Sequence, residues 1–183
     1  MGTDGPTIDL DAADVARARA GDAAAFRRLV ERHQHVVLGL LGTLLPRHAD
    51  REDVAQDAFL AVWAHLPAFD PRRGAFVAWL LTIARNLARN RLRTTRRAER
   101  LRPVPPSDAR PPASSDADPR IDAAVAALPD DQRAAFVLAL VHGLPLETVA
   151  LVEDVPEGTV KSRLSRAKER LRAALRDVLE KTP

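Results

Sequence analysis

The chain has 183 residues, 46% of them apolar, which suits one medium domain or two small ones. It contains no cysteine, which excludes disulfides and thiolate zinc sites and leaves no sign of an oxidising compartment. The formal net charge of +3 conceals two basic blocks, because residues 85–102 carry a balance of +7, residues 158–176 a balance of +6, and the remainder −10. Two basic blocks on an otherwise acidic chain indicate two contacts with a polyanion such as nucleic acid.

The N-terminal sequence predicts helices and no targeting segment. Residues 1–14 (MGTDGPTIDLDAAD) lack the basic start and the apolar run of a signal peptide. No apolar stretch approaches the roughly 20 residues that span a bilayer, so we expect a soluble, cytoplasmic protein without membrane insertion. From Val15 to Leu45 apolar residues recur at helical intervals, with a break at Gly21 and Asp22, where Asp22 can cap the following helix.

The next predicted helix, from Arg51 to Leu66, has an apolar face and an acidic face. On a helical wheel the apolar arc contains Val54, Ala55, Ala58, Phe59, Val62 and Leu66, and the polar arc contains Glu52, Asp53, Gln56 and Asp57. The loop PAFDPRRG (67–74) follows. After it, a long helix is predicted from Ala75 into the first basic block near Arg97.

Residues 101–119 (LRPVPPSDARPPASSDADP) predict a tether instead of a packed element. Six of the 14 prolines lie between Pro103 and Pro119, and large apolar side chains are nearly absent. Such a segment buries too little surface to offset the entropy of ordering it. We therefore expect an all-α protein of two small helical domains, residues 1–100 and 119–183, joined by a Pro-rich flexible linker at 101–118.

Beyond the linker the pattern predicts short helices that end in a helix-turn-helix. Helices are expected at 121–128, 130–141 and 146–153, then a turn at Asp154 and Val155, then a final helix from Pro156 to Leu179. Ala150 is small at the point where the last two helices should cross. Asp154 stands where such turns need a positive φ, which Asp adopts at modest cost.

The final helix separates an apolar side from a polar side. On a helical wheel the first contains Val160, Leu164, Ala167 and Leu171, and the second contains Lys161, Ser162, Ser165 and Arg166. Lys, Arg and Ser near the start of such a helix can reach base edges, while Arg163, Arg170 and Arg172 lie on flanks that suit phosphates. A merely solvated basic helix is the alternative, but only Glu169 offers this helix an acidic partner, so we favour DNA binding.

Two parts of the chain resemble one family. LPDDQRAAFVLALVHGLPLETVALVEDVPEGTVKSRLSRAKERL (128–171) resembles the C-terminal domain of bacterial RNA polymerase sigma factors of the extracytoplasmic-function (ECF) group, within the sigma-70 family. DREDVAQDAFLAVWAHLPAFDPRRGAFVAWLLTIARNLARNRLR (50–93) resembles that group's N-terminal domain, and ARAGDAAAFRRLVERH is similar to its start. The resemblance implies a transcription initiation factor that binds core RNA polymerase and confers recognition and opening of promoters.

The resemblance also implies roles for single residues. The C-terminal domain would read the −35 element through Lys161, Ser162, Arg163, Ser165 and Arg166. The N-terminal domain would bind the β′ clamp helices of core polymerase through Asp53, Gln56 and Asp57. The β subunit is a further contact that the family implies, and an anti-sigma factor is an expected partner.

For the −10 element the resemblance points to the loop PAFDPRRG and the helix after it. Asn86 matches the position that reads a base flipped from the non-template strand, and Asn90 lies one turn further along. Arg89 and Arg93, with Arg85, Arg96 and Arg97, would hold the DNA backbone. Phe69 either helps to wall the base pocket or belongs to the core. Trp79, at helical spacing with Phe76 and Ile83, is interpreted as core.

The sequence shows no motif of a nucleotide-binding, metal-binding or catalytic site. There is no GxxxxGK[ST] loop and no GxGxxG, the histidines do not recur with carboxylates at ligand spacing, and no Ser/His/Asp set can be nominated. We therefore expect no catalytic site, metal or cofactor, and we expect His33 and His35 to be surface groups. Two other functions stay open: an autonomous helix-turn-helix regulator, and an adaptor whose basic helices bind an acidic protein.

Overall fold

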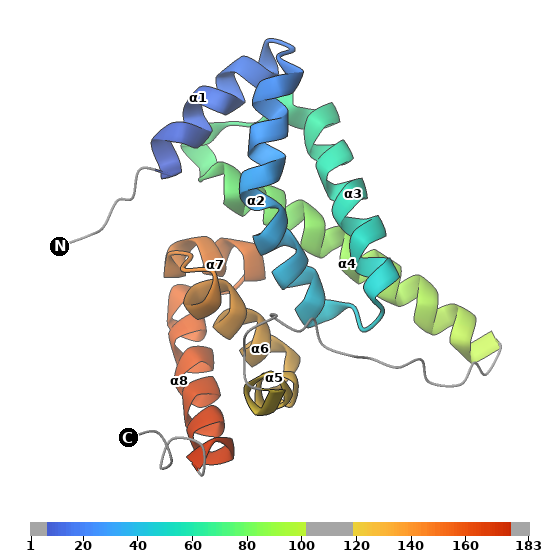
Figure 1. The fold of residues 1–183 in the computed structure, drawn as a ribbon, viewed down its shortest axis with the longest axis vertical. Helices are drawn as coiled ribbons and strands as arrows, with labels where there is room; N and C mark the ends of the chain where they lie inside the picture. Colours follow the sequence, from blue (N-terminus) through green and yellow to red (C-terminus); the bar gives the residue numbers. More distant parts are fainter. Residues whose placement is uncertain (1–6, 102–118, 177–183) are drawn as a thin grey trace.

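The computed structural model describes residues 7–101 and 119–176, which form two groups of helices (Figure 1). The first group contains α1 (Thr7–Arg19), α2 (Ala23–Leu44), α3 (His48–His65) and α4 (Phe76–Leu101), with the 3₁₀ turns η1 (Leu66–Ala68) and η2 (Pro71–Arg73) before α4. The second group contains α5 (Pro119–Ala126), α6 (Asp130–Phe136), the π-helical turn η3 (Val137–Val141), α7 (Leu146–Glu153) and α8 (Glu157–Ala174). The described residues include no strand, which confirms the all-α prediction.

The helices differ from their predicted positions mainly at their ends. Asp22 caps α2 as expected, because its Oδ1 accepts hydrogen bonds from the N–H groups of Ala24 and Ala25 at 2.9 and 3.0 Å. Helix α8 begins at Glu157, so Pro156 is the residue before the helix and not part of its first turn. The predicted end of that helix at Leu179 and the predicted linker from residue 102 onward lie outside the described residues.

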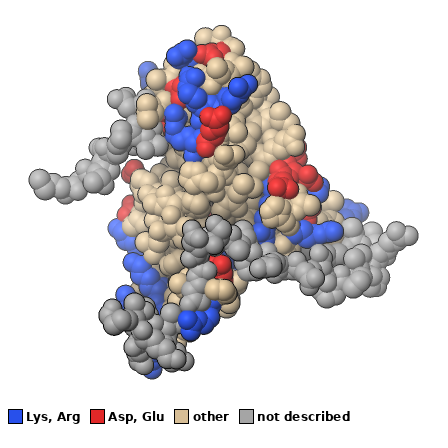
Figure 2. Space-filling model, in the orientation of Figure 1, with Lys and Arg blue, Asp and Glu red and all other residues tan. Residues whose placement is uncertain are grey.

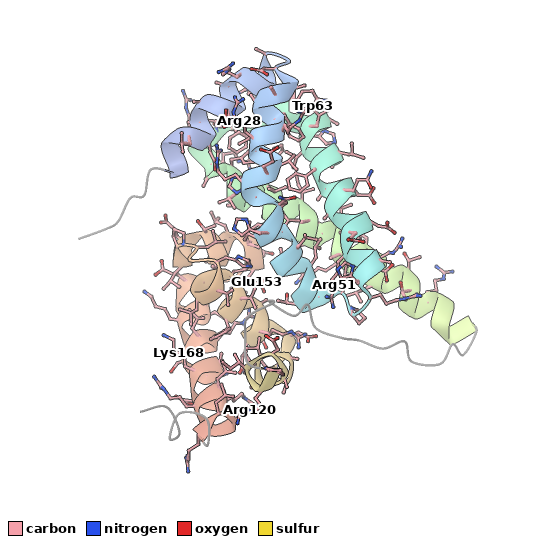
Figure 3. The ribbon with its side chains drawn as sticks, in the orientation of Figure 1. Arg28, Arg51, Trp63, Arg120, Glu153 and Lys168 are labelled. Atoms are coloured by element: carbon pink, nitrogen blue, oxygen red, sulfur yellow. The ribbon has the colours of Figure 1, made fainter. Side chains whose placement is uncertain are left out.

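Arg51, the predicted start of this helix, lies within the first turn of α3 instead, because α3 begins at His48. Its side chain, labelled in Figure 3, is buried, and its Nε donates to the carbonyl oxygen of Leu45 at 2.7 Å. A second bond joins Nη2 to the carbonyl oxygen of Pro46 at 3.0 Å. Arg51 therefore closes the connection between α2 and α3 from inside the first turn of α3, which starts at His48.

A single hydrophobic cluster extends through both groups. It includes Leu29, Leu40, Leu80 and Ala84 of the first group, and Leu138, Val149, Val152 and Val160 of the second. Helix α7 packs against α4, while α6 and η3 pack against α2, so the second group rests against the two longest helices of the first (Figure 1). A smaller cluster of Leu128, Ala167 and Leu171 joins the α5–α6 connection to α8.

The prediction that His33 is a surface group is wrong. Its side chain is buried, and its Nε2 lies 2.9 Å from Oδ2 of Asp11 on α1. Asp11 also pairs with Arg32 at 2.6 Å, and Asp14 pairs with Arg28 at 2.6 Å. The Arg28 guanidinium, labelled in Figure 3, holds the pKa of Asp14 below its usual range. Helix α1 thus covers α2 through charges that no local pattern reveals.

Candidate nucleic-acid interface

The turn between α7 and α8 is closed by main-chain hydrogen bonds. Asp154 has φ 54° and ψ 50°, the left-handed conformation predicted for it. The Val155 N–H donates to the carbonyl oxygen of Ala150 at 3.1 Å, and the Asp154 N–H donates to that of Leu151 at 3.3 Å. These bonds satisfy the last carbonyls of α7 and fix the angle at which α8 leaves the turn.

Helix α8 is anchored by one side and exposed on the other. Val160, Leu164, Ala167 and Leu171 are buried, as the helical wheel predicts. Lys161, Ser162, Ser165 and Arg166 are exposed. Figure 2 shows Lys and Arg gathered along the edge of the molecule that α8 forms. Four side chains suited to base edges therefore lie together on the first three turns of a firmly seated helix.

The contacts of these four side chains are weak ones. Lys161 Nζ lies 2.7 Å from Glu157 Oε1, but both side chains are exposed. Ser162 Oγ donates to the carbonyl oxygen of Thr159 at 2.9 Å, within the same helix. An exposed ion pair of this kind contributes about 1 kcal/mol or less. Lys161 can thus exchange Glu157 for a base or a phosphate at small cost.

Arg163 differs from its four neighbours. Its side chain is largely buried, with Nε 3.2 Å from Asp131 Oδ2 and Nη1 3.5 Å from Glu153 Oε2. Asp131 belongs to α6 and Glu153 to α7, so Arg163 ties α8 to both. In this arrangement Arg163 holds α8 against α6 and α7, while the other four residues of the predicted set face solvent.

Helix α4 carries a polar stripe of the predicted −10 residues. Asn86, Arg89, Asn90 and Arg93 are all exposed. Arg93 Nη2 donates to Oδ1 of Asn90, which orients that amide. Asn86 and Asn90 lie one helical turn apart on the same face, with the arginines beside them. The side chain of Arg96 lies outside the described residues.

Arg85 does not belong to this exposed stripe. It is buried, and its Nη2 donates to the carbonyl oxygen of Glu153 at 2.8 Å, with Nε 3.5 Å from Glu153 Oε1. Burial lowers the pKa of Arg85, and the nearby Glu153 carboxylate opposes that shift. Arg85, the first residue of the basic block at 85–102, is therefore bound to Glu153 of the second helical group.

Phe69 is both a core residue and the wall of a hollow. Its ring is buried, 5.1 Å between centroids from Trp79 and 5.8 Å from Phe76. A cavity of about 330 Å³ opens beside this cluster, lined by Phe69, Trp79, Gly74 and Leu151 among others. The two interpretations of Phe69 are thus compatible. Trp79 is partly buried and packs against the core, as expected.

The acidic face of α3 is exposed, as the wheel predicts. Asp53, Gln56 and Asp57 point to solvent, and Figure 2 shows Asp and Glu grouped over the middle of α3. Arg91 of α4 reaches this face, with Nη2 2.7 Å from Asp50 Oδ1 and 3.3 Å from Asp53 Oδ2. The hydrogen bond to Asp50 raises the pKa of Arg91. Asp53 is thus partly neutralised in this structure.

Other kinds of site find little support in the described part of the chain. No group of three or more His, Cys, Asp or Glu residues is placed to hold a metal ion there. None of the described helices is long and apolar enough to cross a membrane.

Comparison with known families and structures places both groups. Residues 29–98 match the family Sigma-70 region 2, and residues 119–171 match Sigma-70, region 4. The chain is 33% identical to the RNA polymerase sigma-H factor of Pseudomonas aeruginosa over 94% of this chain and 97% of the relative. It is 35% identical to the ECF RNA polymerase sigma-E factor of Escherichia coli K12 over 85% and 88%.

Two solved structures have similar folds. CnrH, solved in complex with the cytosolic domain of CnrY, is 29% identical with a TM-score of 0.68, covering 92% of this chain and 98% of that one. RpoE of Bartonella quintana, solved with the anti-sigma factor NepR, is 28% identical with a TM-score of 0.71, covering 82% and 96%. With both family regions in order and relatives above 30% identity along most of its length, the chain belongs to the ECF group of the sigma-70 family of RNA polymerase sigma factors.

Proposed function

We propose that this sigma factor docks on core RNA polymerase, directs it to promoters with particular −10 and −35 elements, and helps to open the −10 region. Factors of this family give RNA polymerase its promoter specificity at initiation, and the chain carries two of the family's regions. RNA synthesis is assigned to the polymerase, so the chain acts as a specificity subunit without a catalytic site or cofactor of its own. Its work takes place in the cytoplasm, beside the chromosome.

The exposed side of α8 is the observation that carries the proposal. We assign base contacts in the −35 element to Lys161, Ser162, Ser165 and Arg166, because their side chains are exposed on a helix whose opposite side is buried. Lys and Arg donate to guanine, and Ser can contact most bases. Arg163 is assigned to the same element as a residue that becomes available for phosphate when its contacts rearrange.

The first helical group is assigned the −10 element and the polymerase. Asn86 and Asn90 offer a donor and an acceptor to an unstacked base, with Arg89 and Arg93 beside them for phosphates. Phe69 supports the adjoining hollow from the core side. Asp53, Gln56 and Asp57 form the proposed docking face for the β′ clamp helices, and the second group is assigned the contact with the β subunit.

An anti-sigma factor is a further proposed partner. RpoE of Bartonella quintana was solved with the anti-sigma factor NepR, and CnrH was solved with the cytosolic domain of CnrY. Both resemble this chain over most of their length, which supports control of this chain by a protein of that kind.

Transcription with purified components tests the proposal. Core polymerase is supplied with genomic fragments, with and without this chain, and complex formation with core is followed by size-exclusion chromatography. New promoter-dependent transcripts and a stable complex support the assignment. A chain that binds duplex DNA alone but forms no complex with core would instead be an autonomous regulator, and one that binds only acidic protein would be an adaptor.

A further inference from the structure

Helix α1 lies beside the connection between α3 and α4, which carries the loop assigned to the −10 element (Figure 1). The helix packs against α2, η1 and α4. It ends at Arg19, so all of it precedes residues 29–98, the part that matches Sigma-70 region 2. The proposed contacts with DNA and polymerase lie on other elements, yet α1 touches the connection that holds the −10 loop.

Arg19, the last residue of α1, is bonded to the first residue of this loop. Its Nη2 donates to the carbonyl oxygen of Pro67 at 3.0 Å, across 48 positions of sequence. Pro67 lies in η1, a turn of three residues whose own hydrogen bond runs from the Phe69 N–H to the carbonyl oxygen of Leu66 at 3.1 Å. The bond from Arg19 therefore gives the Pro67 carbonyl oxygen a donor from a neighbouring helix and ties the start of the loop to α1.

Buried charges hold α1 in place, so Arg19 reaches the loop from a fixed position. Asp11 and Asp14 of α1 are 8% and 7% exposed. Asp14 pairs with Arg28 at 2.6 Å and with Arg32 at 2.8 Å, and Asp11 pairs with Arg32 at 2.6 Å. Carboxylates buried to this degree keep their partners, because breaking a pair would leave a charge without a partner away from water.

A second path leads from α1 to the wall of the −10 hollow. Asp11 Oδ2 lies 2.9 Å from Nε2 of the buried His33. The His33 ring lies 5.7 Å between centroids from Phe76, and Phe76 meets Phe69 edge-on at 5.8 Å. Phe69 and Trp79 line the cavity of about 330 Å³. The ring that walls the hollow thus rests, through Phe76, on a histidine that α1 holds.

The loop itself is closed by its own short hydrogen bonds. Asp70 Oδ1 accepts from the Arg72 N–H at 3.0 Å, and the Asp70 carbonyl oxygen accepts from the Arg73 N–H at 3.1 Å. Gly74, with φ 141°, then turns the chain into α4 in a conformation that favours glycine. Because the loop is braced internally, its orientation depends on how its two ends are held.

We propose that Arg19 is a positioning residue for −10 recognition, which fixes the loop at 67–74 from α1 while the Asp11–His33 pair supports the Phe69 wall from beneath. The inference rests on the proposed function, since the loop and Phe69 are assigned to the −10 element. A binding site must hold its groups to within about 0.5 Å of the productive geometry. A loop released at Pro67 should therefore leave core binding intact and discriminate less between −10 bases.

Arg19→Ala tests this role, with Arg17→Ala as the matched control. Both arginines are exposed in the last turn of α1, but Arg17 pairs with Asp22 at 3.0 Å instead of with the loop. Holoenzyme is offered competing promoters that differ at single −10 positions. We expect Arg19→Ala to reduce discrimination between bases by about fivefold, the effect of one hydrogen bond of ordinary strength. Core affinity and −35 preference should stay unchanged, and Arg17→Ala should match wild type throughout.

Arg19→Lys provides the rescue, because an ammonium group also donates to a carbonyl oxygen. We expect it to restore most of the discrimination that Arg19→Ala loses. Three results overturn the proposal: wild-type discrimination in Arg19→Ala, the same loss in Arg17→Ala, or a uniform loss of affinity for every −10 variant. The second result would reflect charge alone, and the third would make Arg19 a phosphate contact.

Tryptophan fluorescence follows the wall of the hollow in the free protein. The chain has two tryptophans, so Trp63→Phe leaves Trp79, whose ring lies 5.1 Å from Phe69, as the reporter. In this background we expect Arg19→Ala to increase the quenching of Trp79 by acrylamide, and Arg17→Ala to leave it unchanged. Unchanged quenching in Arg19→Ala contradicts the link from α1 to the wall.

His33→Phe tests the support from beneath, since it keeps a ring beside Phe76 but cannot donate to Asp11. We expect the quenching of Trp79 to increase here too, and wild-type quenching would contradict the role of the Asp11–His33 pair. If the wild type activates no promoter, the proposed function fails. The quenching measurements on the free protein still decide whether Arg19 and His33 position the wall.

Discussion

Arg85 on α4 donates a 2.8 Å hydrogen bond to the main-chain carbonyl of Glu153 on α7, 68 positions later in the sequence. Arg85 directly precedes Asn86, the first of the polar residues on α4 that are assigned to the −10 element. Glu153 is the last residue of α7, directly before the turn of the helix-turn-helix. Their contact joins α4, to which the −10 element is assigned, to the helix-turn-helix, to which the −35 element is assigned.

Glu153→Gln should destabilise the folded protein. The substitution keeps the side-chain size and the main-chain bond but removes the charge that lies beside two arginines, one of them buried. We expect a loss of about 1–3 kcal/mol in the free energy of unfolding, measured by urea denaturation. Glu157→Gln is the matched control, since its exposed pair with Lys161 should contribute about 0.5 kcal/mol or less. If both variants lose the same free energy of unfolding, the charge of Glu153 does not stabilise the protein through Arg85 and Arg163.

The folded protein should become less stable in mild acid because of His142, which packs against Gly39 of α2. Burial, with a smaller effect of His35 on α2, lowers the pKa of His142 from its ordinary value of 6.5. Well above pH 6.5 the ring is neutral in both the folded and the unfolded chain, so His142 does not change the stability there. As the pH falls through this value the unfolded chain binds a proton that the folded protein resists, and the free energy of unfolding decreases until the pH has passed the lowered pKa.

Urea denaturation at a series of pH values checks this pH dependence. We expect the free energy of unfolding to decrease between about pH 7.5 and about pH 5.5. His142→Ala should largely remove the change. Asp14 does not interfere, because its pKa is lowered from 3.8 and it therefore titrates below this window. An identical pH response in His142→Ala would assign it to other groups.

Lys161→Ala and Arg166→Ala should each relax base preference at particular −35 positions. Both side chains are exposed on the outer face of α8, and a specific base contact contributes about 1–3 kcal/mol. Competition binding of holoenzyme to single-base variants of the −35 element measures the loss. Arg172→Ala, on the flank, serves as the control and should weaken all variants alike. Uniform weakening by Lys161→Ala would reduce that residue to a phosphate contact.

Asn86→Ala should impair the −10 element alone. The side chain is exposed on α4 and no hydrophobic contact depends on it, so folding should be unaffected. We expect reduced opening of promoters with the preferred −10 base and unchanged opening of those already altered there, followed by permanganate footprinting. Core binding should match wild type. A variant that binds core poorly would show that Asn86 supports the fold.

Asp57→Lys should weaken docking on the polymerase. Asp57 lies on the exposed acidic face of α3, where a reversed charge opposes a basic partner surface. We expect an affinity for core at least tenfold lower, measured by fluorescence anisotropy, with thermal unfolding unchanged. Ala64→Lys, at the far end of the same helix, controls for charge alone. Equal effects of both substitutions would place the docking face elsewhere.

The spacing of apolar residues predicted the helices and their buried and exposed sides, because buried residues recur every three or four positions along an amphipathic helix. Val160 and Leu164 are buried and Lys161 is exposed for this reason, and Asp154 takes the left-handed conformation that its turn requires. Contacts between distant segments have no such repeat. His33 is buried because Asp11 of another helix lies over it, and Glu153 meets Arg85 only after both groups are folded. Proposed site residues on exposed faces were thus accessible from sequence, whereas the contacts between distant helices were not.

The central claim is that this chain gives core polymerase a promoter specificity of its own, and mapping of transcription start sites tests it most directly. Core polymerase, genomic DNA and this chain are combined in vitro, and the 5′ ends of all transcripts are sequenced with the chain present and absent. The account predicts new start sites that share one sequence motif near −10 and a second near −35, with preference at the second altered by Lys161→Ala. Start sites that are the same with and without the chain would contradict it.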